Sequence, residues 1–178
     1  RAGRYGIDQR TIDWLCENKF LVETSVVPGY DMKKSKGVRM NGPDFTTESF
    51  KPKLLKCRSC NNDILEIPIS VLRPNKMFSF FENYSIIKRV FKKMHYYQML
   101  RPYPNNLDSN IINMRRLFAR KQNINYMLHS SELALNCSPI SSTTSDYNSI
   151  WNNLEQTFRF VSDKYTSLNI SSLSHTND

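Results

Sequence analysis

Helical and extended patterns alternate along this chain, with very short connections between a helix and the strand that follows it. The segment from Asp8 to Asn18 opens with an Asp at a helix N-cap position and has apolar residues at helical spacing. The segment from Phe20 to Val27 then has the aromatic and β-branched residues of a strand, and Pro28-Gly29 ends it. Such a succession is typical of α/β proteins with parallel pairing, so it predicts an α/β fold.

The later segments continue this alternation, by the same patterns of apolar spacing, charge and turn residues. The expected elements are a long loop with a short edge strand from Tyr30 to Cys60, a buried strand from Asp63 to Ser70, a basic amphipathic helix from Ser85 to Met99, a helix from Leu107 to Gln122, a strand from Ile124 to His129, a helix from Asp146 to Lys164 and a short strand from Tyr165 to Ile170. Pro68 suits a strand end or a bulge, because proline has no donor for the ladder.

The composition is that of a globular chain. With 178 residues, 39% of them hydrophobic, it can form one core, or part of one, without a disulfide framework. We expect one domain over residues 1–170 and a polar tail over residues 171–178. The net charge of +9 admits nucleic acid, acidic glycan or anionic lipid as a partner, but charge alone does not choose among them.

The chain contains no run of ~18 apolar residues, and Arg1 to Arg10 lacks the apolar core of a signal peptide. We therefore expect a soluble chain without a transmembrane segment. Because the sequence begins with Arg inside a motif, we also expect that an N-terminal part of the protein, with any signal region, is missing from it.

Cys57-Arg58-Ser59-Cys60 is a Cys-x-x-Cys pair, which can bring two thiolates to one zinc ion or to each other. A structural zinc site needs four ligands, and Cys16, Cys137 and His95 lie far from the pair in sequence. An ordinary pair of loop cysteines is therefore the preferred interpretation, with metal binding or redox use as the alternative.

Lys88, Arg89, Lys92 and Lys93 form the charged face of the expected basic helix, which His95, Tyr96 and Tyr97 follow. Cations beside aromatic rings can bind phosphates and bases. A charged face opposite an apolar stripe is more often solvated, and no nucleic-acid-binding motif accompanies it. We predict no nucleic-acid partner.

Two other positions can carry chemistry. His129 ends an apolar strand pattern, and polar residues at the carboxyl ends of barrel strands are more often catalytic than structural. The alternative interpretation is structural, because a histidine at a strand end often only makes hydrogen bonds that stabilise the fold. Arg1 and Arg4 flank Gly3 before a helix, a pattern that suits an anion or a carboxylate.

In this order, several short segments resemble the carboxyl-terminal half of the polysaccharide deacetylase (NodB-homology) family, in its branch associated with exopolysaccharide biosynthesis. The segments are Arg1 to Gly6, which resembles the third motif; Glu23 to Pro28 and Gly42 to Phe45, which resemble the Asp-Ser-Ser-Val and Gly-Pro-Asp-Phe stretches; Leu65 to Ser70, which resembles a family strand; and Leu128 to Leu133 with Cys137 to Pro139, which resemble the fifth motif. Their succession covers nearly the whole chain.

The resemblance implies an incomplete, distorted (β/α) barrel and a hydrolase that removes N-acetyl groups from a hexosamine-containing polysaccharide. In that family one Asp and two His hold a divalent metal, with zinc the expected ion, and a second Asp is the general base. These residues belong to motifs upstream of Arg1. We therefore expect this chain to contain no ligands for that metal and to be inactive alone.

The resemblance also implies roles for residues that are present. His129 would be the acid that protonates the leaving amine, Arg1 would orient the catalytic Asp, and the backbone N–H of Tyr5 would help to bind the oxyanion. Substrate-binding positions are expected at Arg4, Tyr30, Asp44, Phe45 and Glu132. Glu23 departs from the Asp that relatives tend to have, with Asp44 as its candidate substitute.

Two alternatives stay open beside the enzyme and its poly- or oligosaccharide substrate. A catalytically silent carbohydrate-binding barrel would use Tyr5, Tyr30 and Phe45 to stack on sugar rings. A basic nucleic-acid-binding protein would bind an arbitrary duplex with a steep salt dependence. Upstream Asp-Asp and His-x-x-x-His segments would favour the enzyme over the silent binder.

Overall fold

The computed structural model describes residues 5–33, 42–72, 98–120 and 122–166. The chain divides into two compact units: unit 1 comprises Arg1–Met99 with Asn169–Asp178, and unit 2 comprises Leu100–Leu168. Arg1, Arg4 and residues 85–97 of the expected basic helix lie outside the described residues. No described helix combines the length and the apolar character that crossing a membrane requires.

Unit 1 begins with α1 (Gln9–Glu17), as predicted. The N-cap Asp8 accepts hydrogen bonds from the backbone N–H and the hydroxyl of Thr11, both at 2.8 Å. At the other end, Lys19 is in the left-handed region with φ 61°, and Phe20 N–H donates to Leu15 O at 2.9 Å. This is a Schellman ending, and it turns the chain from the helix directly into the following strand.

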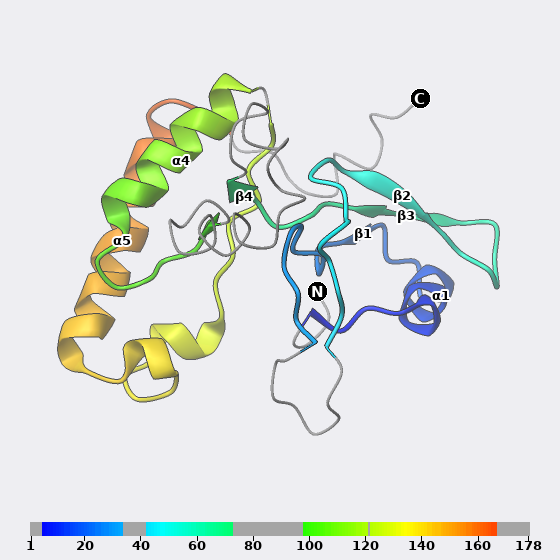
Figure 1. Ribbon diagram of the computed structural model, residues 1–178, viewed down its shortest axis with the longest axis horizontal. Helices are drawn as coiled ribbons and strands as arrows, with labels where there is room; N and C mark the ends of the chain where they lie inside the picture. Colours follow the sequence, from blue (N-terminus) through cyan, green and yellow to red (C-terminus); the bar gives the residue numbers. More distant parts are fainter. Residues whose placement is uncertain (1–4, 34–41, 73–97, 121, 167–178) are drawn as a thin grey trace, which may run out of the picture. The chain divides into compact units, whose positions relative to one another are not determined.

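A three-stranded sheet follows, in the order β1-β3-β2 (Figure 1). β1 (Val22–Glu23) pairs in parallel with β3 (Asp63–Glu66), as expected, whereas the other two strand pairs of the described residues are antiparallel. β2 (Lys53–Lys56) pairs antiparallel with β3 and occupies the sheet edge, as the edge strand expected within the long loop should.

The regular ladders are shorter than the two strands expected from Phe20 to Val27 and from Asp63 to Ser70. Single backbone bonds continue the pairing beyond β3, from Ile67 N–H to Glu23 O and from Ile69 N–H to Val26 O, both at 2.9 Å. Pro68 lies between these two donors and has no N–H to give to the ladder, which suits its position beyond the end of β3. The buried apolar residues of this region form the core of unit 1: Val26, Val27, Ile64, Leu65, Ile67 and Ile69.

β4 (Val71–Leu72) and β5 (Gln98–Met99) form a separate antiparallel pair in unit 1. The predicted helix from Ser85 to Met99 is therefore wrong at its carboxyl end, because Gln98 and Met99 are extended. Their backbone groups bond across to β4, a nonlocal contact that the helical spacing of the sequence does not contain.

Unit 2 is built on α4 (Leu107–Ala119) and α5 (Thr144–Ser162), with two short 3₁₀ helices, η2 (Ser130–Leu133) and η3 (Pro139–Ser141). Both long helices were predicted. α5 begins two residues earlier than expected because the Thr143 hydroxyl caps it, accepting Asp146 N–H at 3.1 Å. The expected strand from Ile124 to His129 has no strand assignment, and Met127 N–H donates to Leu100 O at 3.0 Å.

Polar side chains fill part of the space between the helices of unit 2. Asn110 donates to Arg101 O at 2.9 Å and to Asn153 Oδ1 at 3.3 Å, and Asn153 also bonds the side chain of Asn106. Asn110 and Asn153 are both buried. The packing of α4 and α5 therefore depends on a hydrogen-bonded amide network as well as on apolar residues such as Ile150 and Leu154.

The described residues combine helices with one small mixed sheet and one antiparallel strand pair, and no closed barrel occurs among them. The incomplete deacetylase-type barrel stays a prediction, and so does the single domain over residues 1–170. Of the short strand expected from Tyr165 to Ile170, only Tyr165 and Thr166 are described, and neither has a strand assignment.

Candidate functional site

His129 is exposed at the point where the extended segment of unit 2 ends and η2 begins. Its backbone is fixed on both sides by Glu132: Glu132 N–H donates to His129 O at 2.9 Å, and Glu132 Oε2 accepts His129 N–H at 3.3 Å. The main chain under the imidazole is therefore held by a short reciprocal cap. The imidazole itself lies at the surface.

The carboxylate of Glu132 is buried and forms an ion pair with Arg101. The side chain of Arg101 is 12% exposed, and its guanidinium lies 4.5 Å from the ring centroid of Tyr103. Breaking a buried pair leaves an uncompensated charge, so this contact is costly to remove. The sequence predicts Glu132 as a substrate-binding residue, and the structure turns its carboxylate inward to Arg101.

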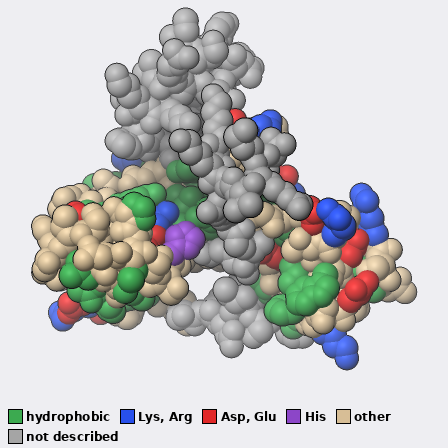
Figure 2. Space-filling model, turned by 90° about the horizontal axis from the view of Figure 1, so that it is seen from below, with side chains coloured by type: hydrophobic (Ala, Val, Ile, Leu, Met, Phe, Trp, Pro, Cys, Tyr) green, Lys and Arg blue, Asp and Glu red, His purple; other side chains and the backbone are tan. Residues whose placement is uncertain are grey.

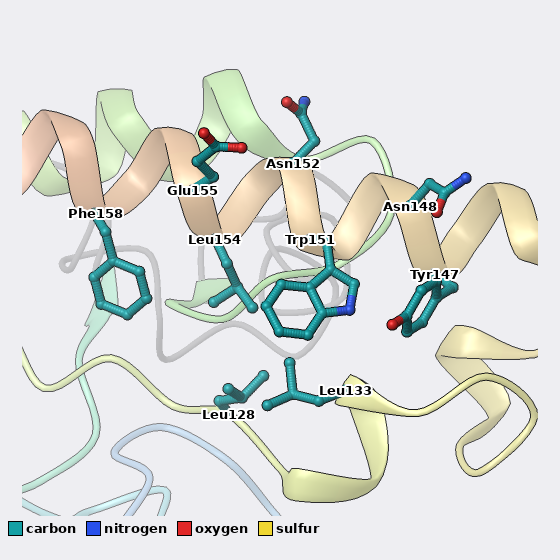
Figure 3. Close-up of a pocket in the computed structure, with 9 residues that line it drawn as sticks. All are labelled: Leu128, Leu133, Tyr147, Asn148, Trp151, Asn152, Leu154, Glu155 and Phe158. Atoms are coloured by element: carbon teal, nitrogen blue, oxygen red, sulfur yellow. The ribbon is translucent and has the colours of Figure 1, made fainter.

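A surface groove, here called the Trp151 groove, lies beside Leu128, which precedes His129, and Leu133, the last residue of η2 (Figure 3). Figure 3 shows Trp151, Tyr147 and Phe158 on the side of α5 that faces Leu128 and Leu133, whereas Asn152 and Glu155 point away from these leucines. The Trp151 side chain is 45% exposed, and its ring centroid lies 6.2 Å from that of Tyr147. The apolar spacing of α5 includes Trp151 and Phe158, but both rings are exposed on this groove.

Two predicted residues of unit 1, Tyr5 and Tyr30, both contact Met99. The Tyr5 hydroxyl lies 3.9 Å from Met99 Sδ, and the Tyr30 hydroxyl accepts Met99 N–H at 3.2 Å. Tyr5 has a φ of 59°, a left-handed conformation that is uncommon for a residue with a side chain. The predicted oxyanion role of its backbone N–H stays a prediction.

Asp44 and Phe45 lie beside Tyr30 in the same loop of unit 1. Phe45 N–H donates to Tyr30 O, and Gly29 N–H donates to Phe45 O, both at 2.8 Å. The Phe45 ring is buried in this structure. Asp44 is hydrogen-bonded to Lys33 Nζ at 2.6 Å and to Thr46, and these contacts hold the pKa of Asp44 well below its usual range.

Sequence reasoning missed a buried pair of carboxyl groups in unit 1. Glu23 and Glu66 are opposite one another in the parallel ladder, and both are 1% exposed. Glu23 accepts hydrogen bonds from the backbone N–H and the hydroxyl of Ser25, and Glu66 Oε1 accepts Val26 N–H at 3.2 Å. Their only signal in the sequence is a charged residue inside an otherwise apolar strand pattern.

The two carboxyl groups have different pKa values. Burial, together with the adjacent Glu23, raises the pKa of Glu66 to about 9. Burial opposes ionisation of Glu23 as well, but hydrogen bonds with Glu66 and Ser25 outweigh it and lower the pKa of Glu23. Near neutral pH the pair therefore holds one proton, on Glu66. A substrate cannot reach carboxyl groups that are buried to this degree, so the pair acts on the stability of the sheet.

The structure brings Cys16 to the Cys-x-x-Cys pair, contrary to the interpretation that it stands alone. The Sγ atoms of Cys16, Cys57 and Cys60 lie within 4.8 Å of one another. Cys16 ends the buried face of α1, and the other two cysteines lie in the turn between β2 and β3. Among the described residues, this is the group of side chains that could hold a metal ion. Cys137 is exposed in unit 2, apart from the cluster.

The basic helix that motivated the nucleic-acid alternative lies mostly outside the described residues. On the face drawn in Figure 2, acidic side chains lie among the Lys and Arg side chains of the described chain. Such mixed charge on this face gives no support to a phosphate-binding surface there.

Comparisons of the sequence and the structure with family models, with curated proteins and with solved structures give no match. The resemblance to polysaccharide deacetylases therefore rests on the sequence segments alone, and its functional implications are proposals.

Proposed function

We propose that this chain is part of a hydrolase of the polysaccharide deacetylase type, which removes N-acetyl groups from a hexosamine-containing polysaccharide. The observation that carries the proposal is the position of His129. His129 is exposed and directly follows Leu128, which lines the Trp151 groove, while its backbone is hydrogen-bonded by Glu132, the buried partner of Arg101.

Hydrolysis of an N-acetyl group breaks an amide bond, so the departing amine needs a proton. Imidazolium can donate that proton near neutral pH, because the unperturbed pKa of histidine lies close to it. In this proposal His129 is the general acid. Glu132 is a positioning residue that acts through the backbone of His129.

The deacetylase metal does not fit the described residues of this chain. Those residues contain no cluster of Asp and His side chains that could hold an ion, and their candidate ligand group consists of three cysteines. No step of the reaction is therefore assigned to a metal bound by this chain. The residues proposed here bind and orient the sugar and supply a proton.

The Trp151 groove supports a sugar ligand. Aromatic rings with a polar edge are suited to surfaces that are apolar on one side and wet on the other, as the face of a sugar ring is. Tyr147 and Trp151 present such rings close together. The same observation favours a second candidate function, a carbohydrate-binding unit that does not hydrolyse its ligand.

Binding is tested first on the 178-residue chain, by titrating it with an N-acetylated chito-oligosaccharide in a calorimeter. Trp151→Ala should weaken binding by at least about tenfold, corresponding to a stacking contribution of roughly 1.4 kcal/mol. Trp14→Ala is the matched control, because Trp14 is also exposed but lies in unit 1. Equal loss in the two variants, or no binding by the wild type, would contradict the sugar site.

Activity is tested on the polypeptide encoded by the complete reading frame that contains this chain, by measuring acetate release. His129→Ala should lower kcat about a hundredfold, the usual scale for a general acid, without changing oligosaccharide affinity or metal content. Unchanged turnover would remove His129 from the mechanism. Binding without acetate release by the wild type would leave the silent carbohydrate-binding unit as the function.

A further inference from the structure

We propose that Cys16, Cys57 and Cys60 form a zinc site that joins α1 to the turn of the β2–β3 hairpin. Figure 1 shows α1 beside the turn end of this hairpin, and the three Sγ atoms lie within 4.8 Å of one another. The site lies wholly in unit 1 and uses thiolates, so it is independent of the proposed sugar chemistry of unit 2.

The three sulfurs lie close enough together to share one zinc ion. Thiolate sulfurs lie about 2.3 Å from zinc, so two sulfurs of a tetrahedral site are about 3.8 Å apart. All three sulfurs lie within 4.8 Å of one another, and the sulfurs of Cys57 and Cys60 are 2.7 Å apart. These two sulfurs must separate by about 1 Å to reach the zinc–thiolate spacing, which rotation of their side chains allows. Cys57 and Cys60 are partly exposed, which leaves a water molecule room to take the fourth position.

The hairpin turn already directs donors at the sulfur of Cys57. Cys60 N–H donates to Cys57 Sγ at 3.1 Å, and the Ser59 hydroxyl lies 3.3 Å from the same sulfur. Such bonds to a ligand sulfur orient it and stabilise its anionic form. The turn therefore holds Cys57 ready to bind a cation.

A second set of hydrogen bonds connects α1 to the same turn. Asp13, one helical turn before Cys16, accepts Arg58 N–H at 2.8 Å and the Gln9 amide at 2.9 Å. The Gln9 amide also donates to Lys56 O at 3.0 Å. Asp13 is thus a positioning residue, which fixes the turn that bears Cys57 and Cys60 against the helix that bears Cys16.

Zinc accounts for the convergence better than a redox pair does. A reversible disulfide needs only Cys57 and Cys60, and it gives no reason for the buried Cys16 to meet them. Three soft thiolates in one place match the ligand preference of zinc. A bound ion would also neutralise the negative charge that three clustered thiolates would otherwise carry.

The first experiment measures metal content in the reduced 178-residue chain after incubation with zinc and gel filtration. The expected result is one zinc per chain in the wild type and in Cys137→Ser, the matched control from outside the cluster. Cys57→Ser and Cys60→Ser should each lose the ion. Replacement of zinc by cobalt should give a thiolate-to-cobalt charge-transfer band in the wild type and in Cys137→Ser, but not in these two variants.

Cys16 is buried, so Cys16→Ser alone does not separate a lost ligand from a lost fold. Alkylation of the wild type, read by mass spectrometry, provides a second measurement. Zinc should protect the partly exposed Cys57 and Cys60 while Cys137 reacts, and a chelator should restore their reaction. Alkylation of Cys57 and Cys60 at equal rates with and without zinc would overturn the proposal.

The positioning role of Asp13 has its own readout. Asp13→Ala should weaken zinc affinity by about 10- to 100-fold, the usual effect of losing a partner just outside the ligands. Asp13→Asn retains an acceptor for Arg58 N–H and should recover most of that affinity, and the surface variant Asp108→Ala should leave it unchanged. A wild-type chain that binds less than about one zinc per five chains, or a Cys137→Ser variant that loses the ion, would refute the site.

Discussion

The buried carboxyl pair of unit 1 makes the stability of the β1–β3 pairing depend on pH, and Glu66→Gln should remove that dependence. Glu66 has an ordinary pKa of 4.5 and a folded-state pKa of about 9. A carboxyl group with a raised folded-state pKa stabilises the fold while it is protonated. That contribution is present below pH 4.5 and is lost as the pH rises through about 9.

The magnitude follows from linkage. Between the two pKa values the folded state holds one more proton than the unfolded state, so the free energy of unfolding falls by about 1.4 kcal/mol per pH unit. From pH 6 to pH 9 the fall has an upper limit of about 4 kcal/mol. Glu23 is ionised in both states over this range, so its lowered pKa does not alter the slope.

Gln at position 66 resembles a protonated Glu in shape and can still accept Val26 N–H. The amides of Ile67 and Ile69 report on the pairing, because they bond across to Glu23 O and Val26 O. At each pH the exchange rate of these amides in the wild type is divided by their rate in Glu66→Gln. This ratio should rise by up to about tenfold per pH unit between pH 6 and pH 9. The ratio cancels the intrinsic pH dependence of exchange.

Glu48→Gln is the control, because Glu48 pairs with Lys53 in a partly exposed position of the same unit. This variant should follow the wild type at every pH. If the ratio of the wild-type exchange rate to the Glu66→Gln rate stays constant from pH 6 to pH 9, the assignment of the buried proton to Glu66 is refuted.

Two further predictions concern unit 2. Arg101→Met leaves the buried Glu132 charge unpaired and should lower the free energy of unfolding by about 3–5 kcal/mol, whereas the double variant Arg101→Met with Glu132→Leu should lower it less. Denaturant titration followed by circular dichroism measures both free energies. Equal losses in the two variants would contradict the ion-pair explanation. Thr143→Ala removes the N-cap of α5 and should cost about 1 kcal/mol by the same method, while Ser145→Ala, inside the first turn, should change little.

The helices could be predicted from the sequence because the signals that start and stop them lie within a few residues. Asp8 caps α1 through Thr11, and Thr143 caps α5 through Asp146. Each interaction spans three residues. The apolar spacing of α5 was also informative, although it did not show that Trp151 and Phe158 stay exposed while Asn153 is buried. Burial of an amide depends on partners such as Asn110, which comes from another helix.

In the candidate sites, too, the sequence predicted the features that depend on neighbouring residues and not those that depend on distant ones. The sequence identified His129 at the end of an expected strand, which has no strand assignment in the structure, and the Cys57 and Cys60 pair in a loop. It did not predict that Glu132 turns inward, because its partner Arg101 is 31 positions away. Nor did it predict that Cys16 joins the pair, because that depends on where α1 packs against β3.

The sequence by itself predicted the helices α1, α4 and α5, and a loop from Tyr30 to Cys60 that contains a short edge strand and ends with the pair of cysteines. These features depend on capping, apolar periodicity and turn residues, all of which act over short stretches of chain. Only the tertiary structure decided that Glu23 faces Glu66 and that Cys16 meets Cys57 and Cys60. Strand register and helix packing join residues that are distant in sequence, and no local preference specifies which of them will meet.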